Sequence, residues 1–292
     1  MLCKGTGERL TFARQELKHY DTSKVCRLIG VSKSGYYSHK LPNESEKSEL
    51  EKAVIHCFEK NKGNYGRIRL KKALEAEGYR ISESKIARIL KENGLKAKDG
   101  RPGTKRHAEP KPTEAQYTEE NLIKDKFSIN TANYLWCSDI TELKYRNGKL
   151  YVCGVLDVAT RRIVGWSIDR HQRKELVHRA FEMAVGRNPI RPTEAVFHSD
   201  RGCQYTAVST KELVEKYGFR KSMSRPGSPH DNQPIESFWH TLSVELPDIR
   251  SMDFDSACRC IVRYIELYYN SDRFHSGIGY QVPNDFFANL TL

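Results

Sequence analysis

The sequence predicts an α/β fold for the second half of the chain, a mixed sheet flanked by helices, behind an all-α first half. Two observations carry this prediction. Before about residue 110, apolar residues recur at helical spacing, whereas short apolar runs between turn signals begin after about residue 130. In the second half the elements follow in the order strand, strand, strand, helix, strand, helix, strand, helix, which is typical of a mixed sheet covered by helices. We therefore divide the chain into 1–110, a linker over 111–130, and 131–292.

The charge is unevenly distributed along the chain. The 292 residues carry a formal net charge of +12. Residues 1–110 hold 25 lysines and arginines against 14 aspartates and glutamates, whereas residues 121–292 hold 23 against 20. A basic first half joined to a nearly balanced second half favours a module that binds a polyanion, although solvated lysines on helices would give the same count.

The eight cysteines do not form a metal-binding pattern. No CxxC pair occurs, and the Cys258-x-Cys260 spacing has no matching second pair, so a zinc site is not expected. The N-terminus has no signal-like apolar stretch, and no run reaches the roughly 18 apolar residues of a membrane helix. We expect a soluble, cytoplasmic protein with reduced thiols and no membrane partner.

The stretch "SKVCRLIGVSKSGYYSHK", residues 23–40, is predicted to form a helix, a tight turn and a second helix. Gly30 supplies the left-handed conformation that ends the first helix, and Ser32 is a good N-cap for the next. This is the pattern of a helix-turn-helix, although an ordinary helical hairpin has the same pattern. The second helix would present several candidate DNA-binding side chains: Lys33, Ser34, Tyr36 and Lys40.

Two further helices are predicted between Gly63 and Gly94, the first ending near Gly78. The stretch that follows, residues 96–116, is rich in proline, glycine and charge and shows no periodicity. We expect it to be a basic linker that lies along nucleic acid.

Three strand-like runs open the second half, and their close spacing predicts an antiparallel meander. These runs are Leu135–Lys144, Leu150–Val158 and Arg162–Ser167. The elements predicted after them are a helix over Glu175–Val185, a strand over Ala195–Phe197, a helix over Ser209–Tyr217 and a short strand over Arg220–Ser224. A last helix follows the segment "SRPGSPHDNQP".

Three acids stand where these elements begin or end. Asp139 lies within the first strand, Asp200 just after the fourth, and Glu236 on the helix behind the Pro/Gly turn. In an α/β sheet such positions converge, and three converging carboxylates repel one another unless a cation neutralises them. Carboxylate oxygens suit Mg²⁺ or Mn²⁺, and two such ions activate an oxygen nucleophile and stabilise the leaving oxygen of a phosphodiester. Taken singly, each acid is better explained as an ordinary strand, turn or helix-start residue.

Helical geometry separates the two faces of the last helix. At 100° per residue, a polar stripe contains Asn232, Glu236, His240 and Ser243. A separate apolar sector contains Ile235, Phe238, Leu242 and Leu246. Glu236 therefore lies beside the packed face of the helix, which would hold its carboxylate rigidly.

The spacing of the three acids resembles the D,D-35-E signature of DDE transposases and retroviral-type integrases, because 35 residues separate Asp200 from Glu236. The surrounding segments are similar, in order, to those of downstream-frame (OrfB-type) transposases of bacterial insertion sequences, in the IS-three family. The most similar segments are "LWCSDIT", "FHSDRGCQY", "SRPGSPHDNQPIESFWHTLSVE" and "YIELYYNSDRFHSGIGYQVPNDFF". In the first half, "CRLIGVSKSGYY" and "NYGRIRLKKALEAEGYRISESKIARILKENGL" resemble that family's helix-turn-helix-like region.

The resemblance implies a ribonuclease-H-like, five-stranded catalytic domain over 131–292 and a DNA-binding region over 1–110. It implies that Asp139, Asp200 and Glu236 are catalytic and hold two Mg²⁺ or Mn²⁺ ions, with Asp139 bridging both. The implied reaction is hydrolysis at the element ends to free a 3′-OH, followed by attack of that hydroxyl on target DNA. The implied partners are element-end and target DNA, further copies of the chain assembled on DNA, and an upstream-frame product joined by frameshifting. The implied location is the bacterial cytoplasm, at the nucleoid.

Two positions depart from the family pattern: Gln233 replaces a common alanine, and Ser243 replaces a common lysine or arginine that meets DNA. Four residues of the second half are DNA-binding candidates: Asn232, His240, Ser243 and Arg273. The loss of charge at Ser243 leaves open a second interpretation, a catalytically weak or inactive DNA-binding regulator of transposition. A cellular ribonuclease H or Holliday-type nuclease would share the fold but would not explain the helix-turn-helix-like half.

Overall fold

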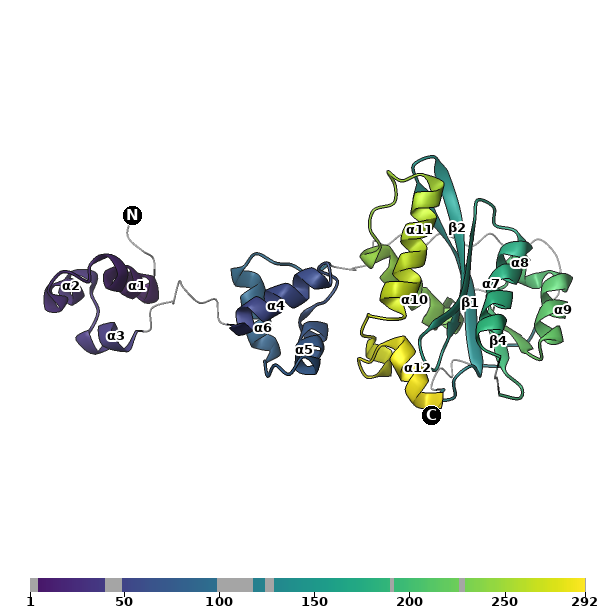
Figure 1. The fold of residues 1–292 in the computed structure, drawn as a ribbon, viewed down its shortest axis with the longest axis horizontal. Helices are drawn as coiled ribbons and strands as arrows, with labels where there is room; N and C mark the ends of the chain where they lie inside the picture. The colour runs from purple at the N-terminus through teal and green to yellow at the C-terminus, as the bar shows by residue number, and fades with distance from the viewer. Residues whose placement is uncertain are drawn as a thin grey trace.

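The computed structural model describes residues 5–39, 49–98, 118–123, 129–189, 192–225 and 229–291. Within these ranges the chain forms two small helical clusters followed by one α/β core (Figure 1). The predicted fold class is confirmed: an all-α first half precedes a mixed five-stranded sheet with flanking helices. The helical half, treated as one region in the sequence analysis, forms two clusters with separate cores.

The first helical cluster contains the predicted helix, tight turn and second helix. Its helices are α1 (Thr6–Glu16), α2 (Thr22–Ile29) and α3 (Lys33–Ser38). The Asp21 side chain accepts a hydrogen bond from the Lys24 amide and starts α2, and Gly30 ends it with a left-handed φ of 69°. Ser32 Oγ then accepts a hydrogen bond of 3.0 Å from the Gly35 amide and starts α3. The small core of this cluster consists of Leu10, Ala13, Val25, Cys26 and Tyr36.

The second helical cluster is larger. Its helices are α4 (Glu49–Lys60), α5 (Arg67–Ala76) and α6 (Glu83–Glu92). Ser82 Oγ accepts a hydrogen bond of 3.3 Å from the Lys85 amide and caps α6. The buried core consists of Val54, Cys57, Phe58, Tyr65, Leu70, Leu74, Ile81, Ile86, Ile89 and Leu90. The opposite face of α6 exposes Lys85, Arg88 and Lys91. Residues 49–98 hold 13 lysines and arginines against seven acids, so this cluster is basic.

The α/β core is built on one sheet with the strand order β3-β2-β1-β4-β5. The strands are β1 (Leu135–Tyr145), β2 (Gly148–Asp157), β3 (Ile163–Asp169), β4 (Val196–Ser199) and β5 (Arg220–Met223). The first three strands form the predicted antiparallel meander. β4 pairs in parallel with β1, and β5 pairs in parallel with β4. This is the strand order of a ribonuclease-H-like fold.

Helices cover both faces of the sheet (Figure 1). The longer core helices are α7 (Lys174–Arg187), α9 (Val208–Lys216), α10 (Gln233–Glu245), α11 (Phe254–Arg263) and α12 (Pro283–Thr291). The shorter ones are α8 (Cys203–Thr206), η1 (Pro229–Asn232), η2 (Tyr264–Tyr269) and η3 (Ser276–Ile278). Of the helices in the described ranges, none has the length and apolar content of a membrane-spanning segment.

Alternate residues of the central strands point into two separate apolar cores. On β1, Leu135 and Cys137 pack with α10 and α11, whereas Trp136 packs on the other face with α7 and α9. The second face is so closely packed that a Cβ at Gly165 of β3 would overlap the Ala180 carbonyl of α7. Both faces of β1 are therefore fixed by packing, which makes this strand a rigid support for a site.

Residues 118–123 lie along β5, although they fall within the linker predicted over 111–130. The Leu122 amide donates to Ser222 Oγ at 3.0 Å, and the Met223 amide donates to the Glu120 carbonyl at 3.4 Å. Ile123 is buried in the core between the sheet and α10. This segment covers the otherwise open edge of β5 and belongs physically to the α/β core.

The helix that begins as α11 continues as a π-helix, η2. Here the Asn270 amide donates to the Ile265 carbonyl, five residues back, at 3.0 Å. The Asn270 side chain then pairs with both backbone groups of Ile163, donating to its carbonyl at 2.9 Å and accepting from its amide at 3.0 Å. The wide helical turn thus fastens the end of η2 to the start of β3.

Candidate active site

Asp139 lies in the middle of the central strand β1, opposite Gly154 of β2. Its Oδ2 accepts a hydrogen bond of 3.0 Å from the indole Nε1 of Trp239, on α10. Gly154 leaves space for this indole, because a Cβ at that position would lie 3.0 Å from the Trp239 ring. The strand and the packed indole together fix the direction of the Asp139 carboxylate.

Asp200 is brought beside Asp139 by the parallel pairing of β4 with β1. The register pairs Ser138 with Ser199, so the next residues along the two strands are Asp139 and Asp200. Neighbouring strands lie about 4.8 Å apart, which places the two acids side by side. Asp200 Oδ1 also accepts a hydrogen bond of 3.0 Å from the Gly202 amide, which orients the carboxyl group at the strand end.

Glu236 lies in the first turn of α10, and its side chain is exposed. Pro234 occupies one of the first two positions of the helix, where a missing amide hydrogen costs nothing. The residues predicted to form the apolar sector, Ile235, Phe238 and Leu242, are buried against the sheet. The predicted division is confirmed within α10, where Glu236, His240 and Ser243 are exposed, whereas Asn232 of the predicted polar stripe lies before the helix and is buried.

The three acids share one electrostatic neighbourhood. Burial raises the pKa of Asp139 to about 8, and the negative charges of Asp200 and then Glu236 add to this effect. A raised carboxyl pKa shows that a negative charge on Asp139 is unfavourable in this environment. A bound cation would reverse this preference, because it stabilises the ionised carboxylates.

An unpaired acceptor next to the acids fits a hydrated divalent cation. Asn232 donates through Nδ2 to the Ser138 carbonyl at 3.0 Å, whereas its buried Oδ1 has no hydrogen-bond partner. Such an atom would accept a hydrogen bond from an ion-bound water. Among the described residues, no three Asp, Glu, His or Cys side chains already enclose a single ion position. The donor chemistry at this end of the sheet, carboxylate and amide oxygen, is that of a Mg²⁺ or Mn²⁺ site.

Two of the four candidate DNA-binding residues of the first helical cluster are accessible. Lys33 and Ser34 are exposed on α3. Tyr36 is only 7% exposed and belongs to the core of the cluster, so the structure does not present it to a ligand. Lys40 lies outside the described residues.

The candidates of the α/β core are divided in the same way. His240 and Ser243 are exposed on α10, and Ser243 Oγ donates to the His240 carbonyl at 2.7 Å. Asn232 is buried beside the acids. Arg273 is 2% exposed and bound to Glu245, so it does not fit the prediction of a surface DNA contact.

Sequence reasoning missed two residues that organise the site. Trp239 packs in the core below α10 and also donates to Asp139. Asp231 is fully buried before α10, where it accepts hydrogen bonds from Asn121 at 2.9 Å and from the Arg225 amide and guanidinium at 2.7 Å. A tryptophan one turn after Glu236 and an aspartate five residues before it were visible in the sequence, but their partners lie about 100 residues away.

A mixed five-stranded sheet in this order, covered by helices on both faces, defines a ribonuclease-H-like core. Family models described as "Integrase core domain" match residues 130–229 and 217–283, and one described as "HTH-like domain" matches residues 45–102. The HTH-like match covers α4, α5 and α6, whereas the first helical cluster lies outside it.

The chain belongs to the family of insertion-sequence transposases. It is 34% identical to the transposase for insertion sequence element IS904 of Lactococcus lactis, over 85% of this chain and 98% of that protein. It is 35% identical to the IS600 31 kDa protein of Shigella sonnei, over 90% and 97% of the two chains. It is 30% identical to the transposase InsF for insertion sequence IS3A of Escherichia coli, over 95% and 98%.

Two solved structures have a distant likeness to the chain. The HTLV-2 integrase catalytic core domain in complex with magnesium is 17% identical, with a TM-score of 0.38, over 53% of this chain and 94% of that one. A chain of the simian T-cell lymphotropic virus intasome is 15% identical, with a TM-score of 0.41, over 76% and 69%. The fold assignment made above rests on the strand order and the family models, not on these distant likenesses.

Proposed function

We propose that this transposase cuts DNA at the ends of its insertion sequence and joins the freed ends to target DNA, using Asp139, Asp200 and Glu236. The observation that carries the proposal is the electrostatic coupling of the three acids at one end of the sheet. Their carboxylates would hold two Mg²⁺ or Mn²⁺ ions, and the unpaired Asn232 Oδ1 would accept a hydrogen bond from a water beside them. The ions, when bound, would lower the pKa of the attacking hydroxyl group and stabilise the leaving oxygen.

The chemistry proceeds in two in-line displacements. In the first, a water oxygen bonds to the phosphorus of an end phosphodiester while the P–O3′ bond breaks, which leaves a free 3′-OH. In the second, that 3′ oxygen bonds to a target phosphorus, and the bond from this phosphorus to a target 3′ oxygen breaks. The protein's part is positioning and charge compensation, since no covalent link to the chain forms.

DNA would be held by exposed groups of all three parts of the chain. On the first cluster these are Lys33 and Ser34 of α3, and on α10 they are His240 and Ser243. On the second cluster the exposed cations of α6 serve this role: Lys85, Arg88 and Lys91. We also propose that the active form contains several copies of the chain on DNA, with or without an upstream-frame product.

The proposal is tested with the purified full chain and a labelled duplex that carries an end of its element. We expect Mg²⁺ or Mn²⁺ to support strand cleavage and chelation to abolish it. Glu236→Gln and Asp139→Asn should still bind the duplex but cut it on the order of 1000-fold more slowly, because several kcal/mol of charge stabilisation is lost. Glu142→Gln is the matched control, since Glu142 lies on β1 but pairs with the exposed Lys149. Equal cleavage by wild type and Glu236→Gln, with DNA bound, would refute the proposal.

A further inference from the structure

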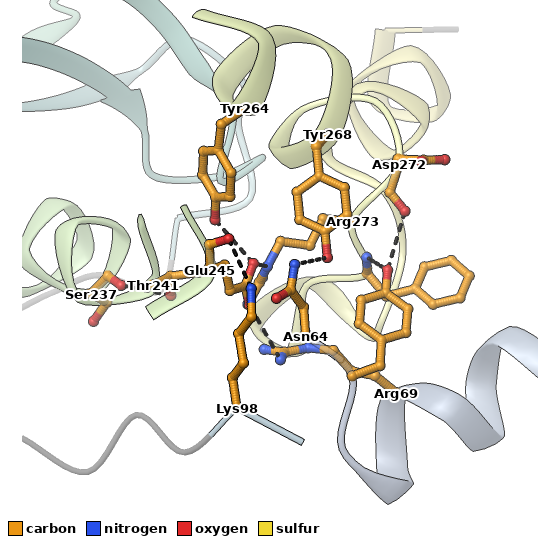
Figure 2. Close-up of polar contacts among 12 residues, drawn as sticks. Asn64, Arg69, Lys98, Ser237, Thr241, Glu245, Tyr264, Tyr268, Asp272 and Arg273 are labelled. Atoms are coloured by element: carbon orange, nitrogen blue, oxygen red, sulfur yellow. Dashed lines mark hydrogen bonds and ion pairs between the residues drawn. The ribbon is translucent and has the colours of Figure 1, made fainter. Parts of the chain in front are cut away.

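The second helical cluster contacts the α/β core at the far end of α10, in a polar junction centred on Glu245 (Figure 2). Glu245 lies in the last turn of α10. Its buried carboxylate accepts two hydrogen bonds of 2.7 Å from the Arg273 guanidinium and one of 3.0 Å from the Tyr264 hydroxyl. We call this set of contacts, together with those that Asn64, Tyr65, Arg69 and Lys98 make to the α/β core, the Glu245 junction.

The second cluster contributes two cations and an amide to the Glu245 junction. Arg69 of α5 lies 3.9 Å from Glu245 Oε1, and Lys98 Nζ donates to the Glu245 backbone carbonyl at 3.3 Å. Asn64 Nδ2 donates to the Tyr268 hydroxyl at 3.1 Å. A lysine at the last carbonyl groups of a helix also compensates the negative end of the helix dipole. The end of α10 is thus held from both the core and the second cluster.

Tyr65 joins the second cluster to the α/β core through both its ring and its hydroxyl group. It is 1% exposed, and its ring is stacked on Phe274 with 6.1 Å between the ring centres. Its hydroxyl accepts a hydrogen bond of 2.8 Å from the Phe274 amide and donates one of 3.2 Å to the Asp272 carbonyl. Phe274 packs in turn against the apolar core of the second cluster. Separating the two bodies would expose the stacked rings of Tyr65 and Phe274 to water, and this loss of apolar burial opposes separation.

The helix held at this junction also carries Glu236. Glu245 lies nine positions after Glu236, which corresponds to about 14 Å of rigid helix at 1.5 Å per residue. Between them, Trp239 ties the same helix to Asp139. Each end of α10 is therefore fixed, one at the three acids and the other at the second helical cluster.

We propose that the Glu245 junction positions the second helical cluster relative to the active site, so that DNA held on this cluster presents one particular phosphodiester to the three acids. This proposal rests on the proposed function, because it concerns which phosphodiester the three acids cut. Arg69 and Tyr65 are positioning residues: they contact the end of the catalytic helix and its support, not the DNA bond itself. The exposed cations of α6 lie on the same cluster and move with it.

The test compares two arginines of one helix in the full-length chain. Arg69→Ala removes a junction contact, whereas Arg67→Ala removes an exposed arginine of α5 that pairs with Glu83 of its own cluster. Tyr65→Phe is a second junction variant that keeps the ring and loses both hydrogen bonds. Three quantities are measured with an end duplex: the affinity, the single-turnover cleavage rate at saturating DNA, and the position of the cut.

We expect Arg69→Ala and Tyr65→Phe to bind the duplex normally, to cut about tenfold more slowly, and to spread their cuts over neighbouring phosphodiesters. A misplacement of about 1 Å costs up to about 100-fold in rate, and a spread of cut positions is not produced by a loss of stability alone. Arg67→Ala should keep the wild-type rate and position. The inference is overturned if the junction variants cut the same bond at the same rate as Arg67→Ala.

A readout that does not depend on cleavage separates failure of the junction from failure of the proposed function. Hydrogen exchange of the amides at Asp272–Phe274 should be faster in Arg69→Ala than in Arg67→Ala. If wild type makes no cut, the proposed function fails, while exchange still decides whether the junction exists in solution. Unchanged exchange in both junction variants would overturn the junction itself.

Discussion

The two helical clusters share a plan but differ in what they touch. Each has three helices, and in each a serine, Ser32 or Ser82, caps the third helix. The second cluster buries Tyr65 against the α/β core and completes its own core with Phe274 from that domain. Within the described ranges, the hydrogen bonds of residues 5–39 stay inside the first cluster.

This difference suggests a division of labour in DNA binding. A cluster whose described hydrogen bonds all stay within it adds affinity for DNA without fixing where the duplex lies relative to the acids. A cluster fixed to the end of the catalytic helix determines where the duplex lies relative to the acids. Two modules of similar architecture are therefore expected to respond differently to the same kind of perturbation.

The largest expected difference comes from equivalent core truncations. Leu70→Ala in α5 and Leu10→Ala in α1 each remove a buried leucine, at a cost of about 2–5 kcal/mol for a fully buried side chain. Leu70→Ala should also increase hydrogen exchange around Phe274 in the α/β core, because that ring packs in the same cluster. Leu10→Ala should change exchange only within 5–39. Exchange measured by mass spectrometry on both variants checks this, and a response of the core to Leu10→Ala would show that the first cluster is also docked.

Lowering the pH should reduce the stability of the fold near the Glu245 junction, by a smaller amount than the core truncations do. Burial, together with the positive charges of Arg273, Arg161 and Arg69, lowers the pKa of His275 to about 3. His275 is therefore neutral in the fold, and its Nδ1 accepts a hydrogen bond of 3.0 Å from the Gly277 amide. Below the unfolded pKa of about 6.5 the unfolded state binds a proton that the fold does not, so stability falls as the pH drops from 6.5 towards 3.

Between pH 7 and pH 5 this group should account for about 1–2 kcal/mol, after allowance for its partial exposure. His275→Asn keeps an acceptor for the Gly277 amide but does not titrate. Denaturant unfolding of both proteins at several pH values checks the prediction, and the variant should lose less stability than wild type. An equal loss of stability in wild type and His275→Asn as the pH falls would exclude His275 as the cause of the pH dependence.

The smallest expected effect concerns the first cluster alone. Lys33→Ala on α3 should weaken DNA binding and reduce the slope of log affinity against log salt by about 0.9, the value for one phosphate contact. The rate and position of cleavage at saturating DNA should not change. Salt titrations of wild type, Lys33→Ala and the control Lys24→Ala measure this. A shifted cut position in Lys33→Ala would contradict the proposal that the second cluster, and not the first, determines where the DNA is cut.

Much of the fold was predictable from local signals. The change of periodicity after the first half and the caps at Gly30 and Ser32 indicated the order and type of the elements. The meander and its mixed sheet followed from strand spacing, and the burial of one face of α10 followed from its helical wheel. The proximity of Asp139 to Asp200 was inferred by grouping both acids with the ends of elements, but Asp139 lies in the middle of β1, and the parallel register of β1 with β4 brings it beside Asp200.

The remaining features depend on partners distant in the sequence. Arg273 was predicted to contact DNA at the surface, but it pairs with Glu245, which also binds Tyr264. The local sequence around Tyr65 does not indicate that it hydrogen-bonds a residue about 209 positions later. The segment 118–123 resembled the linker around it because its polar side chains gave no strand signal, yet Ser222 and Met223 pair with it. Local propensity does not reveal such contacts, because they depend on how complete elements pack.

The π-helix η2 makes this segment more sensitive to insertions and deletions than to substitutions. A π-helical turn holds more residues than an α-helical turn, so deleting one residue within Tyr264–Tyr269 would shift the positions of the residues that follow. Asn270 would then lose both backbone groups of Ile163, and Arg273 would turn away from Glu245. Substitutions in this stretch change one contact each, whereas an insertion or deletion would misalign them all at once. Among related transposases, gaps should therefore avoid this segment even where its residues differ.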